Sequence, residues 1–141
     1  MSPDTRQIVL FTLDAETYGV DILRVQEIVN AGPITPVPAT PKYVLGLTNI
    51  RGRTIPLIDL GQRLGIKDEK KERAQFLILN SEAGDVGLVI DAVTEVWRLD
   101  PESVSSEANS NFKTDLIDGV LDCNGRLAGI LNLERVLGNV Q

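Results

Sequence analysis

Apolar and polar positions follow one another over short stretches of this chain, a pattern that is typical of β-strands. Residues 8–13 and 74–80 are apolar runs of the length of a buried strand. Residues 86–99 are rich in β-branched side chains and predict one long strand. Residues 21–30 suit a helix face as well as they suit a strand. Short strands, many turn residues and no long helical pattern predict an all-β fold with short helices, built from small barrels.

Turn and cap residues separate the apolar stretches. Asn124-Gly125 is a strong signal for a two-residue β-hairpin turn. Asp59 and Asn132 are each expected to cap a short helix, because their side-chain oxygens can accept hydrogen bonds from free backbone N–H groups of the first turn. A glycine follows each of these helices as its expected stop.

The chain contains an internal repeat. When the sequence is shifted by 73 residues, positions 46–65 fall on positions 119–138 without a gap. Six of these 20 pairs are identical, namely Gly46/Gly119, Gly52/Gly125, Arg53/Arg126, Leu60/Leu133, Leu64/Leu137 and Gly65/Gly138. Chance similarity between two β-rich stretches is the alternative explanation. The matching turn glycines favour two halves built on the same plan.

A second block repeats in the same order, at a shift of 68 residues. Its identical pairs are Gly19/Gly87, Ile22/Ile90, Val25/Val93 and Glu27/Glu95. We therefore expect a single domain over residues 8–138, made of two duplicated halves at about 14–72 and 73–138. The N-terminal strand is a candidate for exchange between the halves. Because small halves bury thin cores, the two are expected to pack together.

The repeat also predicts a hairpin turn in the first copy, where Gly52 corresponds to Gly125. Arg51-Gly52 is one possible turn, although arginine is not an easy residue at a position that needs a positive φ. Gly52-Arg53 is the competing register. The sequence alone leaves both open.

Composition limits the classes of function. The chain has 141 residues, of which 43% are hydrophobic and 24% are charged, as in folded globular proteins. A net charge of −6 without a basic stripe argues against nucleic acid and anionic lipid as partners. No apolar run is long enough to span a bilayer, and the N-terminus lacks a signal-peptide core. We therefore expect a cytoplasmic protein without membrane insertion.

The chain has no histidine and one cysteine, Cys123. These counts exclude a Ser-His-Asp triad, a Cys-His dyad, histidine metal sites, a thiolate zinc site and an intrachain disulfide. No phosphate-binding glycine motif occurs either. We expect no catalytic residue, no metal site and no cofactor, and therefore a protein that is not an enzyme.

Five residues still require a choice between structural and functional interpretations. Asp59 and Asp91 could form a catalytic carboxylate pair, but a cap and a backbone partner are the more economical roles. Cys123 is more easily a structural thiol than a reactive one. Trp97 suits a core and a partner surface equally. Arg51 is either a solvated turn residue or a cation that holds two elements or a partner through its forked donors.

These residues resemble the CheW-like domain, the family of chemotaxis coupling proteins. The resemblance rests on Tyr-Gly-Val-Asp-Ile-Leu-Arg-Val-Gln-Glu-Ile at 18–28, on Gly46, Asn49, Arg51, Gly52, Pro56, Asp59 and Leu60, on Gly87, Asp91 and Val93, and on the final hairpin and helix at 121–137. It implies two similar SH3-like five-stranded β-barrel subdomains packed together, with a hydrophobic groove between them.

The resemblance also implies a function. CheW-like adaptors couple the histidine kinase CheA to methyl-accepting chemoreceptors, and they do so as non-catalytic scaffolds. The expected partners are the regulatory domain of CheA and the cytoplasmic tip of the receptors, with the chain a monomer when free and associated with membrane-bound arrays when assembled. The candidate residues for the receptor side and its support are Val25, Glu27, Gly46, Arg51, Val93 and Val96.

Two other functions compete with this one. A ligand-binding barrel or a small carboxylate enzyme would need a convergent polar cluster, which the sequence does not show. A scaffold for a kinase outside chemotaxis would differ only in its receptor.

Overall fold

The computed structural model of the chain forms two compact units. One unit is the continuous segment Arg24–Ala92, and the other combines the residues before and after that segment, Met1–Leu23 and Val93–Gln141. The structure describes residues 6–65, 73–82, 84–99, 104–105 and 115–137.

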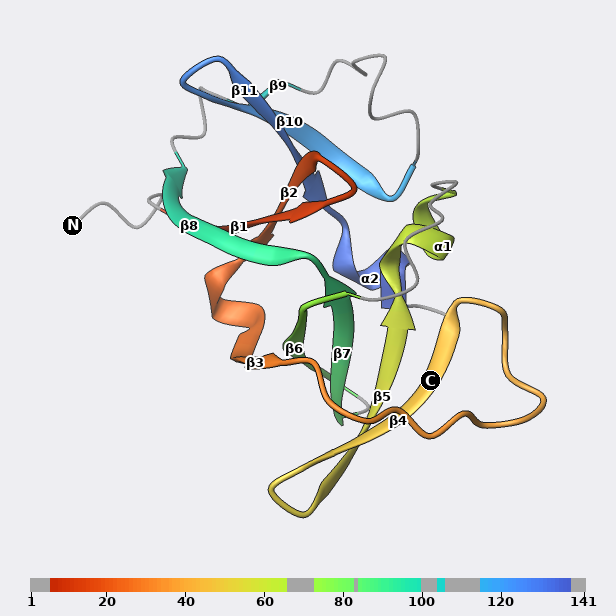
Figure 1. Cartoon of the computed structure of the whole chain (residues 1–141). Coiled ribbons are helices and arrows are strands. Elements are labelled where there is room, and N and C mark those ends of the chain that lie inside the picture. The colour runs from red at the N-terminus through yellow and green to blue at the C-terminus, as the bar shows by residue number, and fades with distance from the viewer. Residues whose placement is uncertain (1–5, 66–72, 83, 100–103, 106–114, 138–141) are drawn as a thin grey trace. The chain divides into compact units, whose positions relative to one another are not determined.

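The continuous unit is built on a five-stranded sheet (Figure 1). Its strands lie in the order β3 (Val25–Asn30), β6 (Gln75–Ser81), β7 (Gly84–Ile90), β5 (Arg53–Asp59) and β4 (Val44–Ile50). Helix α1 (Leu60–Leu64) follows β5 directly. The buried side chains of this sheet form a cluster of Ile55, Leu57, Phe76, Ile78 and Val89.

The other unit is built on a six-stranded sheet. Its strands lie in the order β8 (Ala92–Leu99), β1 (Arg6–Leu13), β2 (Glu16–Asp21), β11 (Arg126–Leu131), β10 (Ile117–Cys123) and the two-residue β9 (Val104–Ser105). Helix α2 (Leu133–Leu137) follows β11, and a 3-10 turn, η1 (Ile22–Arg24), precedes β3. The predicted all-β fold with short helices is confirmed. Five strands were expected in each barrel, and the sixth strand of this sheet is the two-residue β9.

The two sequence halves exchange hairpins. The hairpin β1–β2 of the first half pairs through β2 with β11 of the second half, and β7 of the second half pairs with β5 of the first. Both of these pairings are parallel, whereas the hairpins themselves are antiparallel. Each sheet thus takes one hairpin from each half, and the compact units combine segments of both. The division into halves at about 14–72 and 73–138 stays a prediction.

The two parallel pairings are equivalent in register. Gly19 lies opposite Ile130 in one unit, and Gly87 lies opposite Leu57 in the other. These are equivalent positions in the repeat, which shows that the duplication seen in the sequence extends to the pairing of strands. Each glycine also makes room for its neighbours: a Cβ atom would lie 2.5 Å from Ile8 Cγ2 at Gly19 and 2.5 Å from Leu57 Cδ2 at Gly87.

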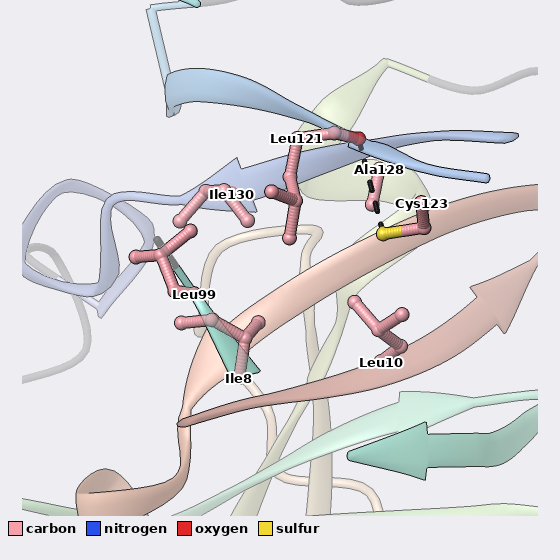
Figure 2. Packing of buried hydrophobic residues seen from close by; sticks show 7 residues of the cluster. All are labelled: Ile8, Leu10, Leu99, Leu121, Cys123, Ala128 and Ile130. Atoms are coloured by element: carbon pink, nitrogen blue, oxygen red, sulfur yellow. Dashed lines mark hydrogen bonds between the residues drawn. The ribbon is translucent and has the colours of Figure 1, made fainter. Parts of the chain in front are cut away.

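The core of the six-stranded unit settles the position of two ambiguous residues. Figure 2 shows its cluster of Ile8, Leu10, Leu99, Leu121, Cys123, Ala128 and Ile130. Trp97 is half-buried and packs against this cluster, so it has a core role. The Cys123 thiol is buried and lies 4.0 Å from the Leu121 carbonyl oxygen, and burial, together with Glu95 and Asp122, raises its pKa.

Two sequence expectations about strands need correction or refinement. The single strand expected over 86–99 is broken at Asp91, where the chain leaves the five-stranded sheet and enters the six-stranded one as β8. The ambiguous stretch 21–30 contains both a 3-10 turn and the strand β3.

The predicted helix caps are present: Asp59 Oδ1 accepts from Gln62 N at 3.2 Å, and Asn132 Oδ1 accepts from Arg135 N at 3.0 Å. Gly65 ends α1 with φ of +76°, while Gly138 lies outside the described residues.

Candidate interaction surface

The turn between β4 and β5 places Arg51 at the tip of a hairpin. Ile50 pairs with Arg53, so the two turn residues are Arg51 and Gly52 rather than Gly52 and Arg53. Their φ angles are +50° and +82°, the sign pattern of a type I′ hairpin turn. The side chain of Asn49 supports the turn by accepting a hydrogen bond from Gly52 N at 3.0 Å.

Arg51 adopts this conformation at an energetic cost. A left-handed backbone brings the Cβ atom of an L-residue close to the following carbonyl oxygen, which costs about 1 kcal/mol or more for residues other than glycine and asparagine. Such strain persists only where the surrounding structure holds it, and it is concentrated at functional positions.

The side chain of Arg51 reaches across the unit to strand β3. Its Nη2 donates to Glu27 Oε2 in an ion pair. Since β3 and β4 are the two edge strands of the five-stranded sheet, this contact shows that the sheet curls until its edges approach each other, as in a barrel. The Arg51 side chain is 71% exposed and that of Glu27 is 21% exposed, so the arginine still presents donors to solvent or to a partner.

Gly46 supports the same hairpin from the other end of β4. Its φ is +147°, and a Cβ atom there would lie 2.2 Å from the Thr35 carbonyl oxygen and 2.9 Å from Pro36 Cα. Thr35 forms an isolated antiparallel bridge with Leu47 of β4, in which each backbone N–H donates to the other residue's carbonyl oxygen at 2.8 Å. Gly46 is therefore buried and has a supporting role, because it allows two backbone segments to approach closely.

A second ion pair holds the hairpin tip. Arg53, directly after the turn, forms an ion pair with Asp85 at the start of β7. Asp85 Oδ1 also accepts a hydrogen bond from Nε2 of Gln26 at 3.3 Å. Gln26 directly precedes Glu27 in the chain. Sequence reasoning missed Arg53, Asp85 and Gln26. The available signals were the identity of Arg53 and Arg126 in the repeat and the place of Gln26 in the motif at 18–28, and neither points to Asp85.

The comparison with known proteins settles the family. The sequence model described as "CheW-like domain" matches residues 7–141. The chain belongs to the CheW-like domain family.

Several CheW proteins resemble the chain over most of its length. The chain is 37% identical over 122 residues to the chemotaxis protein CheW of Treponema pallidum, covering 82% of this chain and 72% of that protein. It is 31% identical over 134 residues to the chemotaxis protein CheW of Rhizobium meliloti, covering 93% and 86%. The crystal structure of the scaffolding protein TtCheW from Thermoanaerobacter tengcongensis superimposes with a TM-score of 0.84 at 33% identity, covering 96% and 90%.

The six candidate residues divide between the two units of this CheW-like domain. Val25, Glu27, Gly46 and Arg51 belong to the continuous unit, where the structure joins Glu27 to Arg51 directly. Val25 is half-buried at the start of β3.

Val93 and Val96 belong to β8 of the other unit, where Val93 is half-buried and Val96 is 49% exposed. A single surface formed by all six candidate residues stays a prediction.

The carboxylates considered for catalysis have structural partners in this CheW-like domain. Asp59 caps α1, and Asp91 Oδ1 accepts from Arg73 Nη1 at 2.7 Å. The Arg73 side chain is only 7% exposed, so this pair fixes the chain where β7 ends. Among the residues that the structure describes, no group of three or more Cys, Asp or Glu side chains is placed to hold a metal ion.

Within the described ranges, the structure contains no helix that is both long and apolar enough to cross a membrane.

Proposed function

We propose that this protein is a chemotaxis adaptor that couples the histidine kinase CheA to the cytoplasmic tip of methyl-accepting chemoreceptors, as a non-catalytic scaffold. Three findings support this proposal. The CheW-like domain covers residues 7–141, relatives named chemotaxis protein CheW match most of the chain, and the similar crystal structure is that of a scaffolding protein.

The observation on which the proposed receptor contact depends is the strained, exposed Arg51 ion-paired with Glu27. An exposed ion pair contributes at most about 1 kcal/mol to stability, which barely offsets the backbone strain of Arg51. The arginine is therefore poorly explained by folding alone. Its planar, forked guanidinium suits recognition of a carboxylate or of backbone carbonyls on a partner.

The receptor tip is a helical hairpin, so its recognition needs apolar contacts as well as polar ones. Val25, Val93 and Val96 supply apolar side chains, while Arg51 and Glu27 supply orientation more than affinity. The kinase contact is expected between its regulatory domain, which has the same fold, and this protein. The free protein is expected to be a monomer in the cytoplasm that associates with membrane-bound receptor arrays.

The first test is calorimetric titration of the whole chain with the regulatory domain of CheA from the same organism. We expect binding near micromolar strength, on the order of −8 kcal/mol. The absence of heat and of co-elution at high concentration would rule out the CheA partnership. A ligand-binding function would then be tested by whether a small molecule raises the melting temperature.

The second test addresses Arg51 in a reconstituted receptor–kinase activity assay. Arg51→Ala and Arg51→Asn are both expected to lower receptor-dependent control of the kinase while leaving CheA binding unchanged. Arg51→Asn places in this turn the residue that the repeat has at Asn124, which accepts a positive φ readily. Arg126→Ala, an arginine of the equivalent hairpin, serves as the matched control. Full coupling by both Arg51 variants would rule out the proposed role of this residue.

A further inference from the structure

We infer that Arg53 and Asp85 are positioning residues that hold Arg51 in place for partner recognition. The inference rests on the proposed function, since it concerns how the same surface is prepared. Asp85 lies at the start of β7 in a part of the chain that none of the motif residues includes. It contacts Arg53 of the β4–β5 hairpin and Gln26 of β3, and so links the hairpin tip to β3 through β7.

The hairpin tip needs such anchors because it extends beyond the paired part of the sheet. The parallel backbone pairing of β5 with β7 runs from Leu57 to Asp59, and Arg53 lies before it. Figure 1 shows the tip of the β4–β5 hairpin reaching past the start of β7. Side-chain contacts therefore link the tip to the neighbouring strands, one to β7 through Arg53 and one to β3 through Arg51.

The two anchors are connected through adjacent residues of β3. Arg51 contacts Glu27, and the preceding residue, Gln26, contacts Asp85. Strand β3 has an irregular register between Val25 and Glu27, so that its ladder is locally distorted beside both contacts. The start of β3 is fixed in turn by Arg24, whose Nε and Nη2 donate to the Asn80 carbonyl oxygen at 3.3 and 3.1 Å.

Exposure separates the roles of the two ion pairs. The Arg51 side chain is 71% exposed, whereas the carboxylate side chain of Asp85 is only 15% exposed. Asp85 is thus largely covered and acts within the protein, while Arg51 remains available to a partner. Fixing Arg51 before binding reduces the side-chain entropy that recognition would otherwise remove.

A binding experiment on the whole chain tests this coupling. The affinity for a soluble fragment of the receptor tip is measured for Asp85→Asn, for Arg51→Ala and for the variant with both substitutions. We expect Asp85→Asn to weaken binding roughly two- to fivefold. The double variant should bind no more weakly than Arg51→Ala alone, because Asp85 acts through Arg51.

Charge reversal and a matched control distinguish positioning from general destabilisation. The combined substitution Arg53→Asp and Asp85→Arg should restore the affinity that either single reversal lowers. Arg126→Gln, at the equivalent position of the other hairpin, should leave the affinity unchanged. Binding to the CheA regulatory domain should be unaffected in every variant. Additive losses from Asp85→Asn and Arg51→Ala, or failure of the double reversal to restore binding, would overturn the inference.

A spectroscopic measurement keeps the inference separate from the proposed function. The order parameter of the Arg51 Nε–H group, measured by nuclear magnetic resonance relaxation on the free protein, should fall in Asp85→Asn and stay unchanged in Arg126→Gln. If Arg51→Ala does not alter receptor binding, the proposed function of Arg51 fails, yet this measurement still decides whether Asp85 holds it. An unchanged Arg51 order parameter in Asp85→Asn would refute the positioning role.

Discussion

The two hairpin tips of the repeat share one backbone plan, but they differ in a turn residue and in its contacts. Arg51-Gly52 and Asn124-Gly125 both have positive φ at both turn residues. In each case the glycine N–H donates to a side chain three residues earlier, Asn49 at 3.0 Å and Asp122 at 2.7 Å.

Both hairpins also share a register shift at the far end, between Val44 and Gly46 and between Ile117 and Gly119. The common plan is therefore sufficient to make the hairpin.

What differs is the turn residue and its partner. Asparagine is among the few side chains that adopt a left-handed backbone readily, so Asn124 suits the turn without further contacts. Arg51 is less suited to the turn, but its side chain forms an ion pair with Glu27 on the opposite edge strand. The second hairpin shows that the shared backbone plan forms the turn without an arginine. The partner recognition proposed for Arg51 would account for the arginine in the first hairpin.

The largest expected effect on stability comes from filling the space at Gly46, where the Thr35 backbone approaches closely. Gly46→Ala should lower the free energy of unfolding by at least about 3 kcal/mol, because the new methyl group meets the Thr35 backbone in addition to the unfavourable φ. Gly52→Ala is the control, since its added Cβ meets open space and only the backbone strain of about 1 kcal/mol applies. Urea denaturation measures both. Equal losses of unfolding free energy in the two variants would show that the close approach of the Thr35 backbone to Gly46 does not add to the cost of Gly46→Ala.

The next effect compares the two parallel pairings. Gly19→Ala should destabilise by about 2–3 kcal/mol and Gly87→Ala by about 1 kcal/mol. The reason is that Ile8 Cγ2 is fixed on a branched Cβ, whereas Leu57 Cδ2 is the end of a side chain that can rotate away. Thermal and urea unfolding of the two variants provide the test. A larger loss at Gly87 would contradict this account of the two sites.

A pH effect distinguishes the two equivalent hairpins β1–β2 and β6–β7. Tyr18 stacks on Phe11 with ring centroids 6.0 Å apart, whereas the equivalent pair in the other unit is Val86 and Leu79. Burial, with Glu16 and Asp14, raises the pKa of Tyr18 from 10.0 to about 12.

The unfolded chain therefore loses this proton first, so the stability falls as the pH rises from about 10 towards 12, by about 1 kcal/mol at pH 11. The difference in stability between the unaltered protein and Tyr18→Phe, followed by urea denaturation over this range, isolates the effect. An identical pH dependence in the two proteins would refute it.

The smallest effect comes from exchanging the turn residues. Arg51→Asn should change the free energy of unfolding by less than about 0.5 kcal/mol, because relief of strain and loss of the exposed ion pair nearly cancel. Asn124→Arg should destabilise by up to about 1 kcal/mol, because it introduces backbone strain that an exposed ion pair with Glu95, the repeat counterpart of Glu27, offsets only in part. Both values come from urea denaturation. A strongly destabilised Arg51→Asn protein would mean that Arg51 is chiefly a structural residue.

The local features of the fold could be predicted from the sequence because they depend on residues close together in the chain. The caps at Asp59 and Asn132 bond backbone groups three residues away. The Asn124-Gly125 turn follows from two adjacent residues. The duplication was also visible, since it is a property of the sequence itself. The stretch 86–99 was predicted correctly as β-structure, but the local pattern does not reveal its break at Asp91, where the side chain accepts from Arg73, 18 residues earlier in the chain.

The sequence alone thus determined the all-β class, the turns, the caps and the repeat, since each depends on backbone preferences and hydrogen bonds over a few residues. Only the tertiary structure decided that β2 pairs with β11 and β5 with β7. The apolar pattern of the strands would be the same if each hairpin paired within its own sequence half. The tertiary structure also decided that Arg51 meets Glu27 and that Arg53 meets Asp85. Arg51 and Glu27 come together because the sheet curls and brings its edge strands close to each other, whereas Arg53 and Asp85 come together because β5 and β7 are neighbours in the sheet. Neither the curvature of a sheet nor its strand order is encoded at any single position.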